Sequence, residues 1–178
     1  MGGLSRGILP LFIAFLFSLT AAAQQEIPRF GYLSYNAVIV RMPEYTNAQQ
    51  QFAELKSKYE AEATRSEEEF QRKFAEFMQG QREFPDVIMQ KRQAELQELM
   101  ERSISFRTES QRLLAEAEQA LKQPAVDRLN EAIQAVGAAE GFMFILNTDG
   151  NTCPFLHPQA GVDVTGAVLE QLGISKNQ

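Results

Sequence analysis

Two long amphipathic stretches meet at Phe84-Pro85 and dominate the hydrophobic pattern of this 178-residue chain. In residues 43–84, apolar or small residues recur every three or four positions, at Phe52, Leu55, Tyr59, Ala63, Ser66, Phe70, Phe74 and Phe77. Residues 86–123 repeat this spacing at Leu96, Leu99, Ser103, Phe106, Ser110, Leu113, Ala117 and Ala120. The spacing predicts two long helices with coiled-coil-like seams, because side chains on a strand alternate every two residues.

The two stretches have nearly equal lengths, and Gly80 and Pro85 weaken the helical pattern between them. A reversal at residues 84 and 85 gives four facing pairs: Phe52 with Ala117, Tyr59 with Ser110, Ala63 with Phe106, and Phe70 with Leu99. Large side chains then mostly face small ones, as close helix packing requires. We therefore expect an antiparallel helical hairpin, with arms of roughly 60 Å at about 1.5 Å per residue.

Shorter elements are predicted on both sides of the hairpin. Before it come an aromatic-rich strand at 29–35 and a brief helix at 37–41 with Asn36 as its N-cap. After it, the helical pattern resumes beyond Pro124, where we expect a kink, and continues to a C-cap at Gly141. The remaining elements are a strand at 142–146, a tight turn at Asp149-Gly150, a third strand at 152–156 that closes a β-hairpin, and a helix at 163–172.

The N-terminal residues 1–23 are typical of a secretory signal peptide. Arg6 supplies the positive charge, residues 8–19 form the apolar run, and Ala21 to Ala23 offer a cleavage site before Gln24. The apolar run is shorter than the roughly 20 residues that span a bilayer, so no stable membrane insertion is expected after cleavage. The predicted organisation is thus a signal peptide (1–23), an oligomerisation body (24–42 and 124–178) and a helical hairpin arm (43–123).

Charge and residue counts narrow the function classes. Loss of the signal peptide removes one of 17 basic residues and leaves 16 against 23 acidic ones, which argues against nucleic acid as a partner. The single cysteine, Cys153, excludes an internal disulfide, and the single histidine, His157, cannot complete a metal site or catalytic triad with it. We expect no metal, no cofactor and no enzymatic activity.

The predicted body is small for an independent core. About 80 of some 155 residues in the cleaved chain fall in the hairpin, and three short strands leave open sheet edges. Self-association would cover such edges and enlarge the core. The fold class is accordingly α+β and mostly helical, with a small β-strand body and one long helical arm per protomer.

The order of these segments resembles the Skp/OmpH family of periplasmic chaperones over nearly all of the chain after residue 23. The resemblance is carried by Phe30-Gly31-Tyr32-Leu33, Met42-Pro43-Glu44-Tyr45, Gln123-Pro124-Ala125-Val126, Ala132-Ile133, Val136, Glu140-Gly141-Phe142, Val162-Asp163-Val164-Thr165 and Leu172-Gly173-Ile174. It implies a jellyfish-shaped homotrimer whose arms surround a cavity. It also implies an ATP-independent holdase that binds unfolded outer-membrane proteins in the periplasm and prevents their aggregation. Consistent with this, the sequence contains no phosphate-binding G-x-x-x-x-G-K-[ST] motif.

One departure from the family concerns charge. Well-known members have basic arms that have been linked to lipopolysaccharide, whereas residues 44–136 here hold 18 acidic and 13 basic residues. We therefore do not carry over a lipopolysaccharide site. The competing hypothesis from the residues is a structural or adaptor coiled coil of the cell envelope with one defined partner.

Candidate client-binding residues lie near the far end of the hairpin. A holdase needs adaptable apolar surface, which Met and Phe side chains provide. Phe70, Phe74 and Phe77 lie on the seam stripe and are assigned to packing between the helices. The candidates for client contact are Met78, Phe84, Val87, Ile88, Met89 and Met100.

Overall fold

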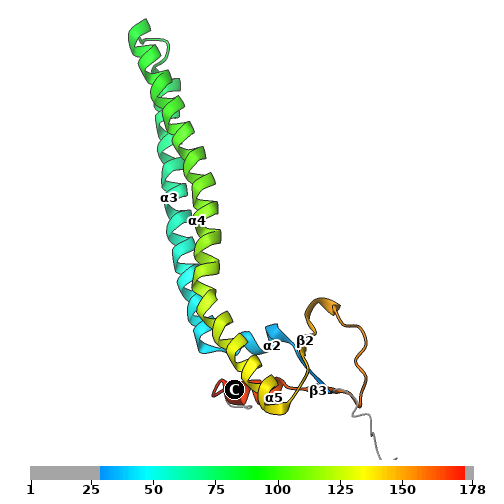
Figure 1. Ribbon diagram of the computed structural model, residues 1–178. Coiled ribbons are helices and arrows are strands. Elements are labelled where there is room, and N and C mark those ends of the chain that lie inside the picture. Colours follow the sequence, from blue (N-terminus) through cyan, green and yellow to red (C-terminus); the bar gives the residue numbers. More distant parts are fainter. Residues whose placement is uncertain (1–28, 175–178) are drawn as a thin grey trace, which may run out of the picture.

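A long two-helix arm stands on a small base in the computed structural model, which describes residues 29–174 (Figure 1). The predicted signal peptide, residues 1–23, lies outside this range. In chain order the elements are β1 (Phe30–Leu33), α2 (Tyr35–Ile39), α3 (Pro43–Gly80), α4 (Asp86–Glu140), β2 (Ile145–Asn147), the 3-10 turn η1 (Asp149–Asn151), β3 (Gly161–Asp163) and α5 (Thr165–Gln171). The predicted fold class, a mostly helical α+β chain with a helical hairpin, is confirmed.

Helices α3 and α4 form the arm and run antiparallel (Figure 1). Pro43 occupies the first turn of α3, where its missing N–H leaves no hydrogen bond unmade, and Pro85 precedes α4. α3 ends at Gly80, four residues earlier than predicted, and a short turn leads from there to Phe84.

The seam differs in detail from the predicted pairing. The ring of Phe106, predicted to face the small Ala63, stacks on the ring of Tyr59 with centroids 6.0 Å apart. Two large side chains therefore meet at this level. Ser110, one turn further along α4, is buried, and its hydroxyl donates to the carbonyl of Phe106 at 2.6 Å. This bond satisfies a polar group that would otherwise be buried without a partner.

Helix α4 passes through Pro124 without ending and continues to Glu140. It bends as it leaves the arm and enters the base, as expected for a proline inside a helix (Figure 1). Beyond Pro124, the buried residues Ala125, Leu129, Ala132 and Val136 face the base at helical spacing. The helix ends at Gly141 in the left-handed conformation (φ 68°), which confirms the predicted C-cap.

The base contains a three-stranded parallel sheet in the order β2-β1-β3. The predicted β-hairpin at Asp149-Gly150 is wrong, and so is the predicted strand at 152–156. The third strand is Gly161–Asp163, and it pairs with β1 rather than with β2. Since β1 has a strand on each side, β2 and β3 lie at opposite edges of the sheet.

The Asp149-Gly150 turn instead binds the start of α2. Gly150 and Asn151 both have positive φ and form a tight turn. The Asp149 carboxylate accepts hydrogen bonds from the Ser34 hydroxyl at 2.6 Å and from the Asn36 backbone N–H at 2.8 Å. Ser34 also accepts from the Ala37 N–H, so the N-cap of α2 is Ser34 and not the predicted Asn36. The helix accordingly starts two residues earlier than expected.

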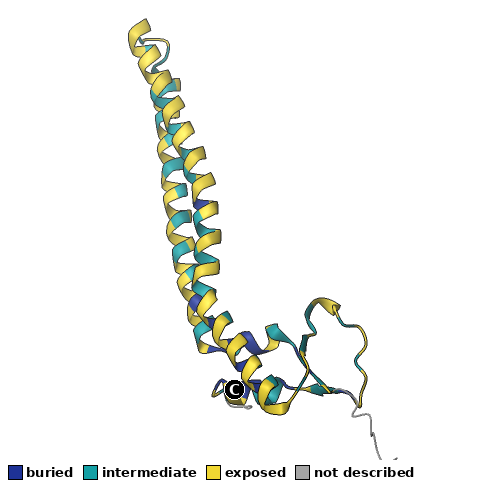
Figure 2. Ribbon diagram, in the orientation of Figure 1, coloured by how far each residue is buried: buried dark blue, intermediate teal, exposed yellow. Residues whose placement is uncertain are grey.

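The hydrophobic core lies in the base, whereas the arm is half-buried along its seam and exposed elsewhere (Figure 2). The largest fully buried side chains come from β1, α2, the start of α3, α4 and α5: Leu33, Val38, Met42, Leu129, Val168 and Leu169. The base is therefore the part in which apolar burial supplies most of the stabilisation.

Candidate binding surface of the arm

The end of the hairpin is closed by Phe84. Its ring packs beside Phe77, with centroids 6.4 Å apart, and lies directly over Gly80. A Cβ atom at position 80 would lie 2.4 Å from Cζ of Phe84, so the ring occupies the space that the glycine leaves open. Phe84, one of the predicted contact residues, is thus half-buried in the turn.

The other predicted contact residues differ in exposure. Val87 is 76 % exposed, Met78 and Met100 are each 48 % exposed, and Ile88 is 41 % exposed. Met89 is half-buried. Four of the six therefore present large apolar surface to solvent, while Phe84 and Met89 are partly engaged in packing.

Two further exposed side chains were not among the predicted contact residues. Phe74, assigned to the seam, is 44 % exposed, and Ile104 is 58 % exposed. The reason is geometric, because a step of four residues overshoots a full helical turn by about 40°. Phe74 therefore lies to one side of the seam residue Phe70, and Ile104 lies beside Met100, which is itself exposed. Reading the flanks of the helices separately from the stripe could have identified them.

The two sides of the arm carry different kinds of side chain at the same distance from the base. On one side, Phe70, Met100, Ser103 and Ile104 line a shallow hollow together with Glu67 and Arg107. On the other, the hollow between the helices is lined mainly by charged side chains, Glu62, Arg65, Glu69 and Arg102, above Ser66, Leu99 and Phe106. Each hollow is lined by one small seam residue, Ser66 in the charged hollow and Ser103 in the apolar one.

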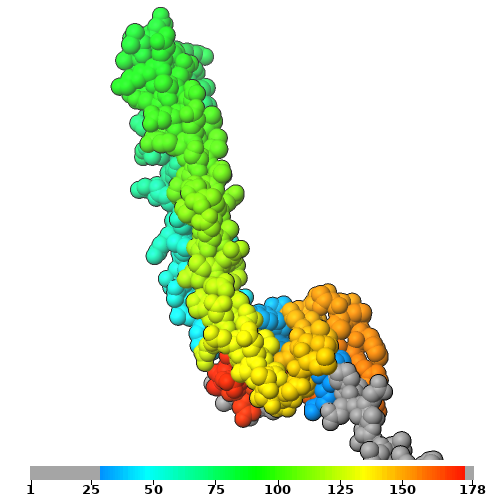
Figure 3. All heavy atoms as spheres, in the orientation of Figure 1, coloured from blue at the N-terminus to red at the C-terminus, as the bar shows by residue number. Residues whose placement is uncertain are grey.

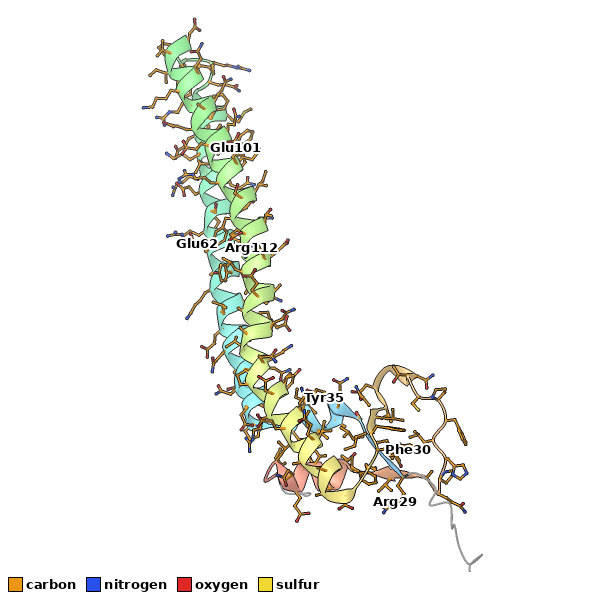
Figure 4. All side chains as sticks on the ribbon, in the orientation of Figure 1. Arg29, Phe30, Tyr35, Glu62, Glu101 and Arg112 are labelled. Carbon is orange, nitrogen blue, oxygen red and sulfur yellow. The ribbon has the colours of Figure 1, made fainter. Side chains whose placement is uncertain are left out.

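Side chains project all along the arm (Figure 4), and many of the charged ones form ion pairs. Most of these pairs join residues three or four apart on one helix. The hydrogen bonds that the Arg112 guanidinium donates to Glu109 and Glu116 raise its pKa. Two pairs join α3 to α4: Glu67 with Arg107 at 3.2 Å in mid-arm, and Glu44 with Arg128 at the base. In the space-filling view the arm is a narrow column with side chains projecting along its length (Figure 3).

The base offers no arrangement of metal ligands in the part of the chain that the structure describes. Cys153 is half-buried after η1, with its thiol 3.6 Å from the Phe155 carbonyl, and His157 follows in the same irregular segment. Among residues 29–174, no helix combines the length and apolar composition that a membrane span needs.

Comparison with known families gives a match over most of the chain. The family model described as "Outer membrane protein (OmpH-like)" matches residues 29–172, which include the arm and nearly all of the described base. The match confirms the resemblance drawn from the sequence segments. A comparison with curated proteins gave no match.

Proposed function

Because this chain belongs to the OmpH-like family, we propose that it is a periplasmic holdase that binds unfolded outer-membrane proteins without ATP. Family membership supports a chaperone-like role in the periplasm. The proposal that the chain binds unfolded outer-membrane proteins rests on the exposed apolar surface of the arm. Six large apolar side chains of the arm, Phe74, Met78, Val87, Ile88, Met100 and Ile104, are 41–76 % exposed.

The composition of this surface suits weak binding of many sequences. Methionine has a flexible and polarisable side chain that adapts to irregular partners, and it contributes two of the six residues. Contiguous apolar surface on a soluble protein marks an interaction site more often than a random feature of the exterior. Val87 and Ile88 lie in the first turn of α4, next to the hairpin turn, where a long client would meet them first.

The charges of the arm serve solubility in this proposal. Residues 44–136 carry more acidic than basic side chains, and the local ion pairs keep both signs interspersed along the surface. A net negative charge limits self-association of arms that expose apolar side chains. Client capture then depends on apolar contact rather than on a positively charged cavity, and no lipopolysaccharide site is proposed.

Assembly into a homotrimer completes the proposal. The base exposes Met143 and Phe155 by more than 70 % and Phe144 by 50 %, and both edge strands of its sheet are open. Contact between three bases would cover these groups and leave three arms around a shared cavity. We propose residues 24–42 and 124–178 as this oligomerisation body and residues 43–123 as the arm.

The test is suppression of aggregation for several unrelated unfolded barrel proteins, measured by light scattering in the absence of ATP. We expect near-complete suppression when trimer and client are equimolar. Activity toward a single partner would favour the structural or adaptor coiled coil instead. Activity toward none would refute the holdase.

A second measurement locates client capture on the arm. The double variant Val87→Gln, Ile88→Gln removes exposed apolar groups without emptying the seam. We expect weaker binding of a full-length unfolded barrel with unchanged assembly. Glu68→Gln, an exposed substitution elsewhere in α3, is the matched control and should bind as the unaltered protein does.

A further inference from the structure

One side of the arm collects most of its exposed apolar side chains. Phe70, Met100 and Ile104 line the same hollow. The ring of Phe74 stacks on that of Phe70, with centroids 6.0 Å apart, and Met78 follows one turn further along α3. We call this set, Phe70, Phe74, Met78, Met100 and Ile104, the apolar face.

The charged side chains nearest the apolar face lie at its edges, where Glu101 accepts a hydrogen bond from Gln97 at 2.9 Å. Gln71, Gln93 and Gln97 share this side by helical spacing, and all three are uncharged. The ion pair between Glu67 and Arg107 bounds the face toward the base. The opposite side of the arm carries a succession of ion pairs: Glu62 with Arg65, Lys73 with Glu76, Arg92 with Glu95, and Glu98 with Arg102. The arm therefore has two chemically distinct sides.

The spacing of the apolar face matches an extended chain. Side chains four residues apart on a helix lie about 6 Å apart along its axis. Alternate side chains of a β-strand lie about 6.6 Å apart. A segment that lies along the arm in extended conformation therefore places every second side chain near a successive member of the face, such as Phe70, Phe74 and Met78.

We propose that the apolar face binds extended segments in which apolar and polar residues alternate. This inference rests on the proposed function and specifies which part of a client is bound. Transmembrane strands of barrel proteins have this alternation, with few charges on their apolar side. A face whose lining charges, Glu67 and Arg107, are paired at its edge suits such a segment, because no unpaired charge has to lose its hydration. The polar side chains of the bound segment remain in water.

Fluorescent labels placed on the two sides of the arm test where the segment binds. In a Cys153→Ser background, the substitution Gln97→Cys puts a label beside the apolar face. The substitution Arg102→Cys puts one in the opposite hollow. The ligand is a soluble ten-residue peptide that alternates Leu and Thr. We expect the fluorescence of the label at position 97 to change saturably with peptide concentration and that of the label at position 102 to stay constant. Equal fluorescence changes at both positions would overturn the proposal.

A second peptide tests the requirement for alternation. It has the same composition, but its Leu residues are grouped at one end. We expect it to bind about tenfold more weakly, because grouped side chains in an extended chain cannot all reach the face. Equal affinity for the two peptides would show that the face takes apolar residues in any order, and the proposal would fail.

Two matched double variants separate the face from the tip. Met100→Gln, Ile104→Gln alters the face, and Val87→Gln, Ile88→Gln alters the tip. Each replaces two exposed apolar residues by good helix formers, and circular dichroism verifies the fold. We expect the dissociation constant of the alternating peptide to rise about tenfold for the face variant and less than about twofold for the tip variant. Equal effects would overturn the assignment.

The outcomes distinguish this inference from the function on which it rests. If the unaltered protein keeps no unfolded barrel soluble, the proposed function fails. If it keeps several soluble and the face variant does so equally well, only the inference about the face fails. If the label at position 97 responds to protein concentration without peptide, a second copy covers the face, which also overturns the proposal.

Discussion

Asp149 illustrates how one side chain connects distant parts of the base. Both of its carboxylate oxygens bind the start of α2, more than 110 residues away in sequence. The bond from the Ser34 hydroxyl, followed by the bond from the Asn36 N–H, holds the pKa of the Asp149 carboxyl below its usual value. The turn after β2 is thereby fixed to the helix that follows β1.

This lowered pKa predicts a pH dependence of stability. Because the folded-state pKa lies below the unfolded one, the carboxylate stabilises the fold above the unfolded pKa. That contribution is lost as the pH falls through the folded pKa. We expect Asp149→Asn to be less stable than the unaltered protein at pH 7 and to lose less stability between pH 7 and pH 3. Urea unfolding at both pH values measures this.

The matched control for the Asp149 experiment is Glu68→Gln, which removes an exposed carboxylate from the arm. It should leave the difference in stability between the two pH values nearly unchanged. If Asp149→Asn shows the same pH dependence as this control, Asp149 does not contribute to acid sensitivity.

Gly31 allows close packing in the central strand of the sheet. A Cβ atom there would lie 2.9 Å from Cγ1 of Ile145 and 3.0 Å from Cγ1 of Val164. Both neighbours belong to or pack against the core, so they have little room to move. We expect Gly31→Ala to lower the free energy of unfolding by about 1–3 kcal/mol, measured by chemical denaturation. A variant of unchanged stability would mean that the sheet adjusts without strain.

At the scale of elements, the joint between arm and base depends on α4. This helix belongs to both parts, and Pro124 lies within it. Arg128, one turn beyond, forms an ion pair with Glu44 of α3 and donates a hydrogen bond to the Leu172 carbonyl at 2.9 Å. One guanidinium therefore connects the first turn of α3, α4 and the C-terminal end of α5.

We expect Arg128→Gln to lower the free energy of unfolding by about 1–2 kcal/mol. A partly exposed ion pair contributes little to this free energy, and a hydrogen bond to a charged group contributes more. The free energy of unfolding of Arg128→Lys should lie between those of Arg128→Gln and the unaltered protein, because an ammonium lacks the planar fork that reaches both partners. Denaturant unfolding gives the free energies. The control is Arg112→Gln, whose ion pairs lie within α4 alone, and it should show a smaller loss.

At the scale of the molecule, the core and the arm have different means of stabilisation. Buried side chains from β1, α2, α4 and α5 pack together in the base, whereas the arm has a narrow half-buried seam and few fully buried residues. The exposed Met143, Phe144 and Phe155 then leave the base with apolar surface that a single protomer does not cover.

Self-association is expected to cover that surface. Sedimentation equilibrium of the protein cleaved after residue 23 should give a mass of about three protomers. The double variant Met143→Ser, Phe155→Ser should shift the equilibrium toward monomer, because it removes two side chains that are more than 70 % exposed. The tip variant Val87→Gln, Ile88→Gln should assemble normally. A stable monomer of the unaltered protein at micromolar concentration would contradict the proposed trimer.

The candidate site was predictable only in part. The exposure of Met78, Val87 and Ile88 was predictable from sequence because a two-helix seam cannot bury every apolar residue near a hairpin turn, but the same argument also included the half-buried Met89. Phe84 was also identified, but its packing over Gly80 depends on where α3 ends. Phe74 and Ile104 were missed because their exposure depends on the rotation of each helix about its axis. That rotation is set by contacts such as the Tyr59–Phe106 stack.

The sequence by itself determined the helical hairpin, its reversal near Pro85, the passage of α4 toward Gly141 and the C-terminal helix. These features follow from local periodicity and from the backbone limits of proline and glycine, which act within a few residues. Only the tertiary structure decided that β1 lies between two parallel partners, that Asp149 binds the start of α2, and which side of the arm is apolar. Each of these depends on contacts between segments far apart in the chain, and such contacts leave no periodic signal within any one segment.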